Sequence, residues 1–124
     1  MTNSDIERVP NKALPSKSAV TLYRFPGGGG LLYAVATSRD KSLDLPGQTA
    51  DTLALLDEHL KTAGIDRTRI LRADVVVIDH DQKPAFDRVW ASWMPDGQGP
   101  VRSFVQSVMP EGDLIEILIV AALR

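Results

Sequence analysis

The stretch that decides the fold is the last one, GPVRSFVQSVMPEGDLIEILIVAALR, residues 99–124. Its middle, MPEGD at 109–113, holds proline, glycine and aspartate, which are typical of a turn. The residues on either side are rich in valine, isoleucine and leucine, so they predict two strands joined as a hairpin. Each strand keeps one charged residue among apolar neighbours, Arg102 in the first and Glu116 in the second.

These two charges need an explanation, because burying a carboxylate among leucine and isoleucine is costly unless it is paired or hydrogen-bonded. With an odd number of residues in the turn, Arg102 and Glu116 fall on the same face, roughly 7 to 14 Å apart. The planar guanidinium of Arg102 can grip a carboxylate with two hydrogen bonds, and Glu116 can hold a water or exchange a proton. A structural ion pair between subunits explains the pattern equally well.

The composition indicates one globular domain, with 124 residues of which 44% are hydrophobic and 24% are charged. The formal net charge of -2 supplies no basic field for nucleic acid or for an anionic membrane surface. The chain has no cysteine, which excludes disulfides and thiolate metal sites and agrees with a cytoplasmic location. No apolar run is long enough to predict a membrane span, and the polar first residues do not predict a secretory signal.

The first third of the chain predicts an arm and a hairpin. Residues 1–18 hold two prolines and scattered charges, so they predict an extended N-terminal arm, followed by a folded domain over residues 19–124. AVTLYR at 19–24 and LLYAVAT at 31–37 predict two strands joined by a glycine-rich turn. The four glycines at 27–30 lack the lysine and the following helix that a phosphate-binding loop requires.

The middle of the chain predicts two helices and a strand between them. Residues 47–63 predict a helix with Thr49 as its cap, because leucines recur at helical spacing and a glycine follows. ILRADVVVI at 70–78 predicts a buried strand. Residues 84–94 predict a second helix, and the tryptophans on its apolar stripe favour core packing over a ligand stack.

The order strand, strand, helix, strand, helix, strand, strand predicts an α+β fold in which two helices cover one face of a mixed sheet of five or six strands. Residues 75–78 and 114–123 are apolar at nearly every position, which is typical of strands that are buried on both faces. Because the helices cover only one face, we expect the second face to pack against other copies of the chain in a homo-oligomer.

Three stretches, residues 47–66, 70–93 and 100–123, together resemble the RidA/YjgF-type reactive intermediate deaminase family. The resemblance covers about residues 31–123 and rests on the order of the glutamine-led helix, the arginine strand and the glutamate strand. It implies a chorismate-mutase-like fold, a homotrimer whose sheets line a central barrel, and sites in the clefts between subunits. It also implies hydrolysis of enamines and imines of the 2-aminoacrylate type to keto acids and ammonia, with no metal or organic cofactor.

By position, the resemblance assigns two roles. Glu116 matches the family glutamate that positions the attacking water, and is the expected catalytic residue. Arg102 matches the family arginine that binds the substrate carboxylate. The match of Gln48 concerns the fold and not the chemistry. A small carboxylate-bearing substrate and the chain itself are therefore the expected partners, without nucleic acid or membrane.

The other expected substrate-binding positions depart from the family pattern. Ala36 lies in a Val-Ala-Thr run where the family has Ser-Gly-Gln, Asp87 replaces a common asparagine, and Phe104 replaces a cysteine-type residue. Tyr23 is a loose match to an N-terminal tyrosine of the family. The spacing from Arg102 to the catalytic glutamate is also one residue shorter. These departures favour a substrate different from the family's archetype, including larger enamines of the aminomuconate type.

Three alternatives accompany this hypothesis. The first is a non-catalytic trimer that binds keto acids or other small carboxylates in the same cleft. The second is the family's older label of ribonuclease or translation inhibitor, against which the acidic charge balance argues. The third is a metal site at residues 79–81 (Asp-His-Asp), for which the spacing suggests no third or fourth ligand, so a solvated turn is the preferred interpretation.

Overall fold

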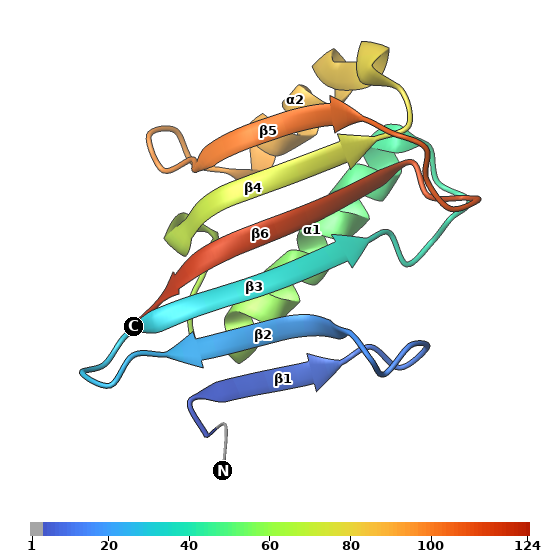
Figure 1. The fold of residues 1–124 in the computed structure, drawn as a ribbon. Helices are drawn as coiled ribbons and strands as arrows, with labels where there is room; N and C mark the ends of the chain where they lie inside the picture. The colour runs from blue at the N-terminus through green and yellow to red at the C-terminus, as the bar shows by residue number, and fades with distance from the viewer. Residues whose placement is uncertain (1–3) are drawn as a thin grey trace.

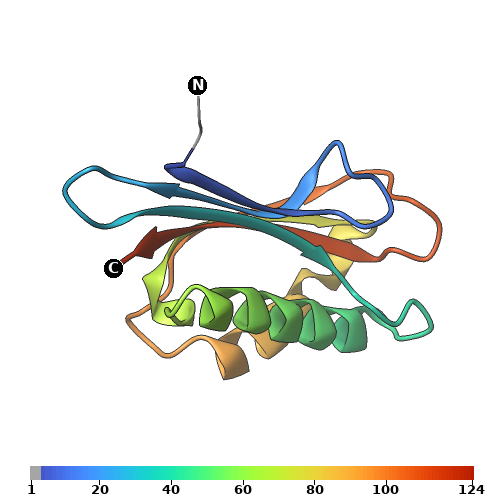
Figure 2. The same ribbon diagram turned by 90° about the horizontal axis from the view of Figure 1, so that it is seen from below.

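The computed structural model describes residues 4–124. Within them the strands form one six-stranded sheet in the order β1-β2-β3-β6-β4-β5. Both helices pack on the same face of this sheet (Figure 1, Figure 2). The predicted α+β architecture is therefore confirmed. The elements in chain order are β1 (Ile6–Pro10), β2 (Ser18–Arg24), β3 (Gly30–Thr37), α1 (Leu45–Thr62), β4 (Ile70–Val77), α2 (Lys83–Trp93), β5 (Val101–Gln106) and β6 (Ile115–Leu123).

The predicted closing hairpin is wrong, because β5 and β6 are not neighbours. β4 lies between them, parallel to β5 and antiparallel to β6. A parallel pair needs a crossover connection, and α2 supplies it by returning the chain to the edge of the sheet beside β4. The segment 107–114 then crosses to the far side of β4, where the longer and more apolar β6 pairs with β3 (Figure 1).

Within the predicted N-terminal arm, residues 6–10 form a strand of the sheet, β1. β1 pairs antiparallel with β2 and forms one edge of the sheet, while β5 forms the other (Figure 1). Pro10 lies at the end of this edge strand, where a missing backbone donor is tolerated. The predicted hairpin of β2 and β3 is confirmed. Gly30 is required at its turn, because a side chain there would collide with the Tyr23 carbonyl oxygen.

Helix α1 begins earlier than predicted, and Thr49 is not its cap. Asp44 is the N-cap, and its carboxylate accepts a hydrogen bond from the Gly47 backbone nitrogen at 3.0 Å. Pro46 lies in the first turn, where its missing N–H costs nothing. Thr49 is buried and its hydroxyl donates to the Leu45 carbonyl at 2.7 Å. Gly64 follows the helix with φ of +76°, as a C-terminal glycine should.

The core lies between the helices and the sheet, and alternation along the strands builds it. Every second residue of β6, from Ile115 to Leu123, points toward the helices, and the odd-numbered side chains are at most 4% exposed. On the other face Tyr33 and Leu118 remain 44% and 40% exposed. The main members of the core are Leu32, Leu45, Leu53, Leu56, Leu60, Val75, Val77, Phe86, Ile115, Ile117 and Ile119.

Gln48 is a polar residue within this core and is completely buried. Its Nε2 donates to the Gly112 carbonyl at 2.9 Å, and its Oε1 accepts from the Leu114 backbone nitrogen at 3.0 Å. The side chain thereby ties α1 to the loop that leads into β6. Its role is structural, in agreement with the sequence interpretation.

None of the helices within residues 4–124 is both long enough and apolar enough to cross a membrane.

Candidate functional site

Arg102 lies on the edge strand β5 and points toward α2. It pairs in register with Ala73, which is buried on the helix-covered face, so the two side chains share that face. The guanidinium lies over two aromatic rings of α2, 5.0 Å from the centre of Phe86 and 5.3 Å from that of Trp90. The side chain is only 20% exposed. Stacking on this aromatic shelf fixes the plane of the guanidinium and shields it partly from water.

Asp87 lies beside the guanidinium and is paired on both of its oxygens. Its Oδ1 accepts from Arg102 Nη2 at 2.6 Å, and its Oδ2 accepts from Lys83 Nζ at 2.8 Å. Partial burial acts to raise the pKa of the Asp87 carboxyl, but the hydrogen bonds and positive charges of Lys83 and Arg102 outweigh it and leave that pKa below its usual value. Asp87 is therefore ionised at neutral pH.

Phe104 completes this group, which we call the arginine cluster (Arg102, Asp87, Lys83, Phe86, Trp90 and Phe104). It lies two residues after Arg102 and hence on the same face of β5. Its ring packs 5.1 Å from Phe86 and 5.2 Å from the ring of His80. Three of the residues predicted for the site, Arg102, Asp87 and Phe104, are thus brought together.

Glu116 lies on the other, open face of the sheet. Its neighbours along β6, Ile115 and Ile117, are completely buried on the helix side, so Glu116 points away from the helices. It pairs in register with Thr37 of β3. A hollow of about 130 Å³ adjoins it, lined by Asn11, Lys17, Ala19, Val35, Ala36, Thr37 and Glu116.

The expectation that Arg102 and Glu116 share a face is wrong. It assumed that β5 and β6 pair directly, whereas β4 separates them. Arg102 lies level with Ala73 of β4, and Glu116 lies level with Val76. The two backbones are therefore about 10 Å apart along the strands and about 10 Å apart across them, with the side chains on opposite faces. One small molecule cannot touch both residues within one chain.

Ala36 lines the hollow beside Glu116, whereas Tyr23 joins neither this hollow nor the arginine cluster. The side chain of Ala36 belongs to the core, and its neighbours Val35 and Thr37 face the open side. Tyr23 pairs with Leu31 at the far end of β3 from Thr37, six residues and roughly 20 Å away. Its ring packs instead against Phe25, with ring centres 5.6 Å apart.

Two lysines of the candidate site were not anticipated. Lys83 is four residues before Asp87 on α2, and this i, i+4 spacing of opposite charges is a signal that sequence inspection could have used. Lys17 lies in the predicted arm, where no pattern indicates that the chain folds back toward Glu116.

Residues 79–81 form a turn that is held by its own side chains. The carboxylate of Asp79 accepts from the Asp81 backbone nitrogen at 3.0 Å. The backbone nitrogen of His80 donates to Gln106 Oε1 at 2.8 Å. In the described part of the chain, no three histidine or acidic side chains gather as a metal site would require.

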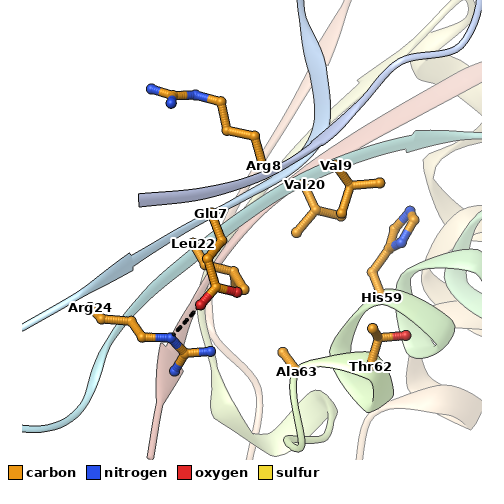
Figure 3. A pocket seen from close by; sticks show the side chains of 9 residues that line it. All are labelled: Glu7, Arg8, Val9, Val20, Leu22, Arg24, His59, Thr62 and Ala63. Carbon is orange, nitrogen blue, oxygen red and sulfur yellow. Dashed lines mark hydrogen bonds and ion pairs between the residues drawn. The ribbon is translucent and has the colours of Figure 1, made fainter. Parts of the chain in front are cut away.

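A larger hollow, of about 330 Å³, lies at the opposite edge of the sheet from the arginine cluster (Figure 3). β1 and β2 form one wall and the last turns of α1 form the other. An ion pair between Glu7 and Arg24, at 2.9 Å, lies at one end. Burial lowers the pKa of His59, which lines the other side. None of the residues predicted for the site lines this hollow.

Comparisons with known proteins place the matched region across most of the sheet. The family model described as Endoribonuclease L-PSP matches residues 33–123. The RutC family protein YoaB of Escherichia coli K12 is 35% identical over 92 residues, which cover 73% of this chain and 81% of that protein. A RutC family protein of Haemophilus ducreyi is 27% identical over 108 residues, covering 86% and 89% of the two chains.

Solved structures resemble the whole fold. A member of the YjgF protein family from Neisseria meningitidis superposes with a TM-score of 0.84 at 25% identity, covering 99% of this chain and 98% of the other. A related protein from Mycobacterium tuberculosis has a TM-score of 0.77 at 22% identity, covering 94% and 98%. The second likeness concerns the fold alone.

Proposed function

The chain belongs to the RidA/YjgF family, and from that premise we propose that it hydrolyses a small carboxylate-bearing imine or enamine to a keto acid and ammonia. The family membership predicted from the three stretches of sequence is confirmed. The observation that supports the activity most directly is the guanidinium of Arg102, which is stacked on an aromatic shelf and largely shielded from water.

Arg102 is suited to hold the substrate carboxylate. Within residues 4–124, Asp87 is the one side chain that accepts a hydrogen bond from its guanidinium, through Nη2. Nη2 carries a second hydrogen, and together with Nε or Nη1 it can form the two parallel hydrogen bonds that a carboxylate accepts. A charge-assisted bond in a partly desolvated position is stronger and more directional than one in water.

Glu116 can take part only if it comes from a different copy of the chain than Arg102, because the two residues of one chain point to opposite faces. We therefore propose a homotrimer in which the open face of each sheet is covered and each site lies between two subunits. The apolar side chains of Tyr33 and Leu118 on that face support such an assembly, because monomers rarely leave large apolar patches uncovered.

The proposed reaction uses two side chains of the protein. The carboxylate is held by Arg102, and Glu116 orients a water toward the carbon of the C=N bond and accepts one of its protons. Collapse of the resulting carbinolamine forms the keto acid and releases ammonia. The proposal requires no metal or organic cofactor, because imines of this type already hydrolyse slowly in water.

The direct test is ammonia release from freshly generated 2-aminoacrylate and from an aminomuconate. Arg102→Ala should lower kcat/KM by on the order of 100-fold, because the carboxylate loses its anchor. Arg88→Ala is the matched control, since Arg88 is exposed on the same helix as Asp87. Absence of ammonia release above the uncatalysed rate, from a folded trimer with either substrate, would refute the activity.

A second candidate is a non-catalytic trimer that binds small carboxylates. The pairing of Arg102 with Asp87 favours it, since the anchor is already partly neutralised. Calorimetry would then show binding of a keto acid such as pyruvate, lost in Arg102→Ala, without any turnover.

The ribonuclease label has less support, because the net charge is -2; we expect no RNA binding even at low salt. The cytoplasmic location stays a prediction.

A further inference from the structure

The arginine cluster contains an acid in an unexpected place. A site that binds a carboxylate through Arg102 would be expected to keep other negative charges away. Asp87 instead contacts the guanidinium directly, at 2.6 Å, and the hydrogen bonds of its two oxygens keep it ionised. Any carboxylate that binds the remaining N–H groups of Arg102 must lie close to this negative charge.

Asp87 has capacity for a further partner. Each of its oxygens accepts one hydrogen bond, from Arg102 or from Lys83. A carboxylate offers about four acceptor positions in all, so lone pairs remain on both oxygens. A donor next to the substrate carboxylate could use one of them, and a positively charged donor would also relieve the repulsion between the two carboxylates.

From this geometry we propose that Asp87 selects substrates in which a positively charged nitrogen lies next to the carboxylate. The inference rests on the proposed function and names its substrate form, the zwitterionic iminium. The carboxylate of that molecule binds Arg102, while its C=NH2⁺ group donates a hydrogen bond to Asp87. A plain carboxylate has no such group and meets the negative charge of Asp87 unrelieved.

This role assists hydrolysis because the iminium is the more electrophilic form of the imine. Water adds its oxygen to the carbon of C=NH2⁺, and the C–N bond then breaks. Both protons of the water leave with the nitrogen, so that the iminium and one water give the keto acid and one ammonium ion. Asp87 keeps its charge throughout and stabilises the cation by proximity.

Binding of a matched pair of stable ligands tests the selection without any turnover. L-alanine and propionate share a carboxylate and a carbon chain, and they differ by one ammonium group. By calorimetry at pH 7, the wild-type protein should bind L-alanine on the order of tenfold more tightly than propionate. Asp87→Asn keeps the shape and a hydrogen bond to Arg102 but removes the charge, and it should abolish or reverse this preference.

Two further variants make the test sharper. Lys83→Met removes a competing cation from Asp87 and should strengthen the preference for L-alanine. Asp81→Asn removes an acid from the neighbouring turn, which does not touch Arg102, and should leave the preference unchanged. Circular dichroism and sedimentation confirm that each variant keeps its fold and assembly.

The outcomes separate this inference from the proposed function. An Asp87→Asn protein that keeps the wild-type preference, or a wild-type protein that binds neither ligand, overturns the inference. If the wild type releases ammonia and the Asp87→Asn protein keeps the wild-type preference, the selection by Asp87 is rejected and the proposed deaminase activity stands. A preference that depends on Asp87 without any ammonia release keeps the zwitterion site and rejects the deaminase. In an active enzyme, Asp87→Asn should also move the alkaline limb of the kcat profile to lower pH, because less of the bound imine stays protonated.

Discussion

The two faces of the sheet differ in how completely a single chain covers them. On the helix-covered face, Ile115, Ile117 and Ile119 are completely buried, and the core needs nothing from outside. On the open face, the alternating residues of the same strand include Glu116 and the 40% exposed Leu118. The proposed site divides in the same way, since Arg102 faces the helices and Glu116 faces the open side. One face therefore holds the core of the chain, and the homotrimer proposed above would cover the other.

The largest effect is expected from breaking the open face. Leu118→Asp should abolish the trimer and lower ammonia release by on the order of 100-fold or more, because each proposed site needs two copies. The fold should persist, since Leu118 lies outside the core. Sedimentation velocity and circular dichroism measure both properties. Ala54→Asp, on the exposed side of α1, is the control for an added charge. A trimeric and active Leu118→Asp protein would contradict the assembly.

The neighbouring residue on the covered face should behave in the opposite way. Ile117→Ala leaves a cavity in the core and should lower the free energy of unfolding by about 3 kcal/mol. At concentrations where the variant stays folded, the oligomeric state should not change. Urea unfolding at matched protein concentration measures the stability, and sedimentation of the same samples measures the oligomeric state. A loss of trimer without a loss of stability would show that the two faces are not independent.

This difference between the faces also explains which features of the fold could be predicted from the sequence. The local pattern reports which segments are helices or strands, so the architecture follows from it; residues 75–78 were expected to be buried on both faces, but Val75 and Val77 are buried and Ile78 is 45% exposed. The local pattern does not report which strands are neighbours. The turn-like residues 109–113 therefore suggested a hairpin, although the chain crosses β4 there.

The candidate site was predictable to the same extent. Arg102, Asp87 and Phe104 lie together as their assignment to one site requires, because α2 packs over β5. Their relation to Glu116 depends on strand order and on assembly, which are properties beyond local sequence. The Thr49 cap was wrong for a local reason, since Asp44 caps the helix and Pro46 occupies its first turn.

Gln48, on α1, is one of the buried polar residues between the helices and the covered face of the sheet. Gln48→Leu should lower the free energy of unfolding by about 2 kcal/mol, because the Leu114 N–H and the Gly112 carbonyl lose their hydrogen bonds to the buried Gln48 side chain. The loop into β6 should open first, and hydrogen exchange of the Leu114 amide would report it. Thr52→Val, at another buried polar position on α1, is the control. The Thr52 hydroxyl donates to the Gln48 carbonyl, which also accepts a backbone hydrogen bond of the helix. Equal protection of the Leu114 amide in wild type and Gln48→Leu would contradict this role.

The smallest effect on stability is expected on the solvent-facing side of α1, where ion pairs take the place of apolar contacts. Asp51 accepts hydrogen bonds from the Arg39 side chain and backbone nitrogen, which lower its pKa to about 2. A carboxyl whose pKa falls on folding stabilises the protein above its unfolded value near 4, and this contribution disappears as the pH drops toward 2. The urea midpoint of Asp51→Asn should therefore lie slightly below that of the wild type at pH 7 and approach it below pH 3. A difference that stays constant from pH 7 to pH 2.5 would show that the amide disturbs packing, and that charge plays no part at this surface.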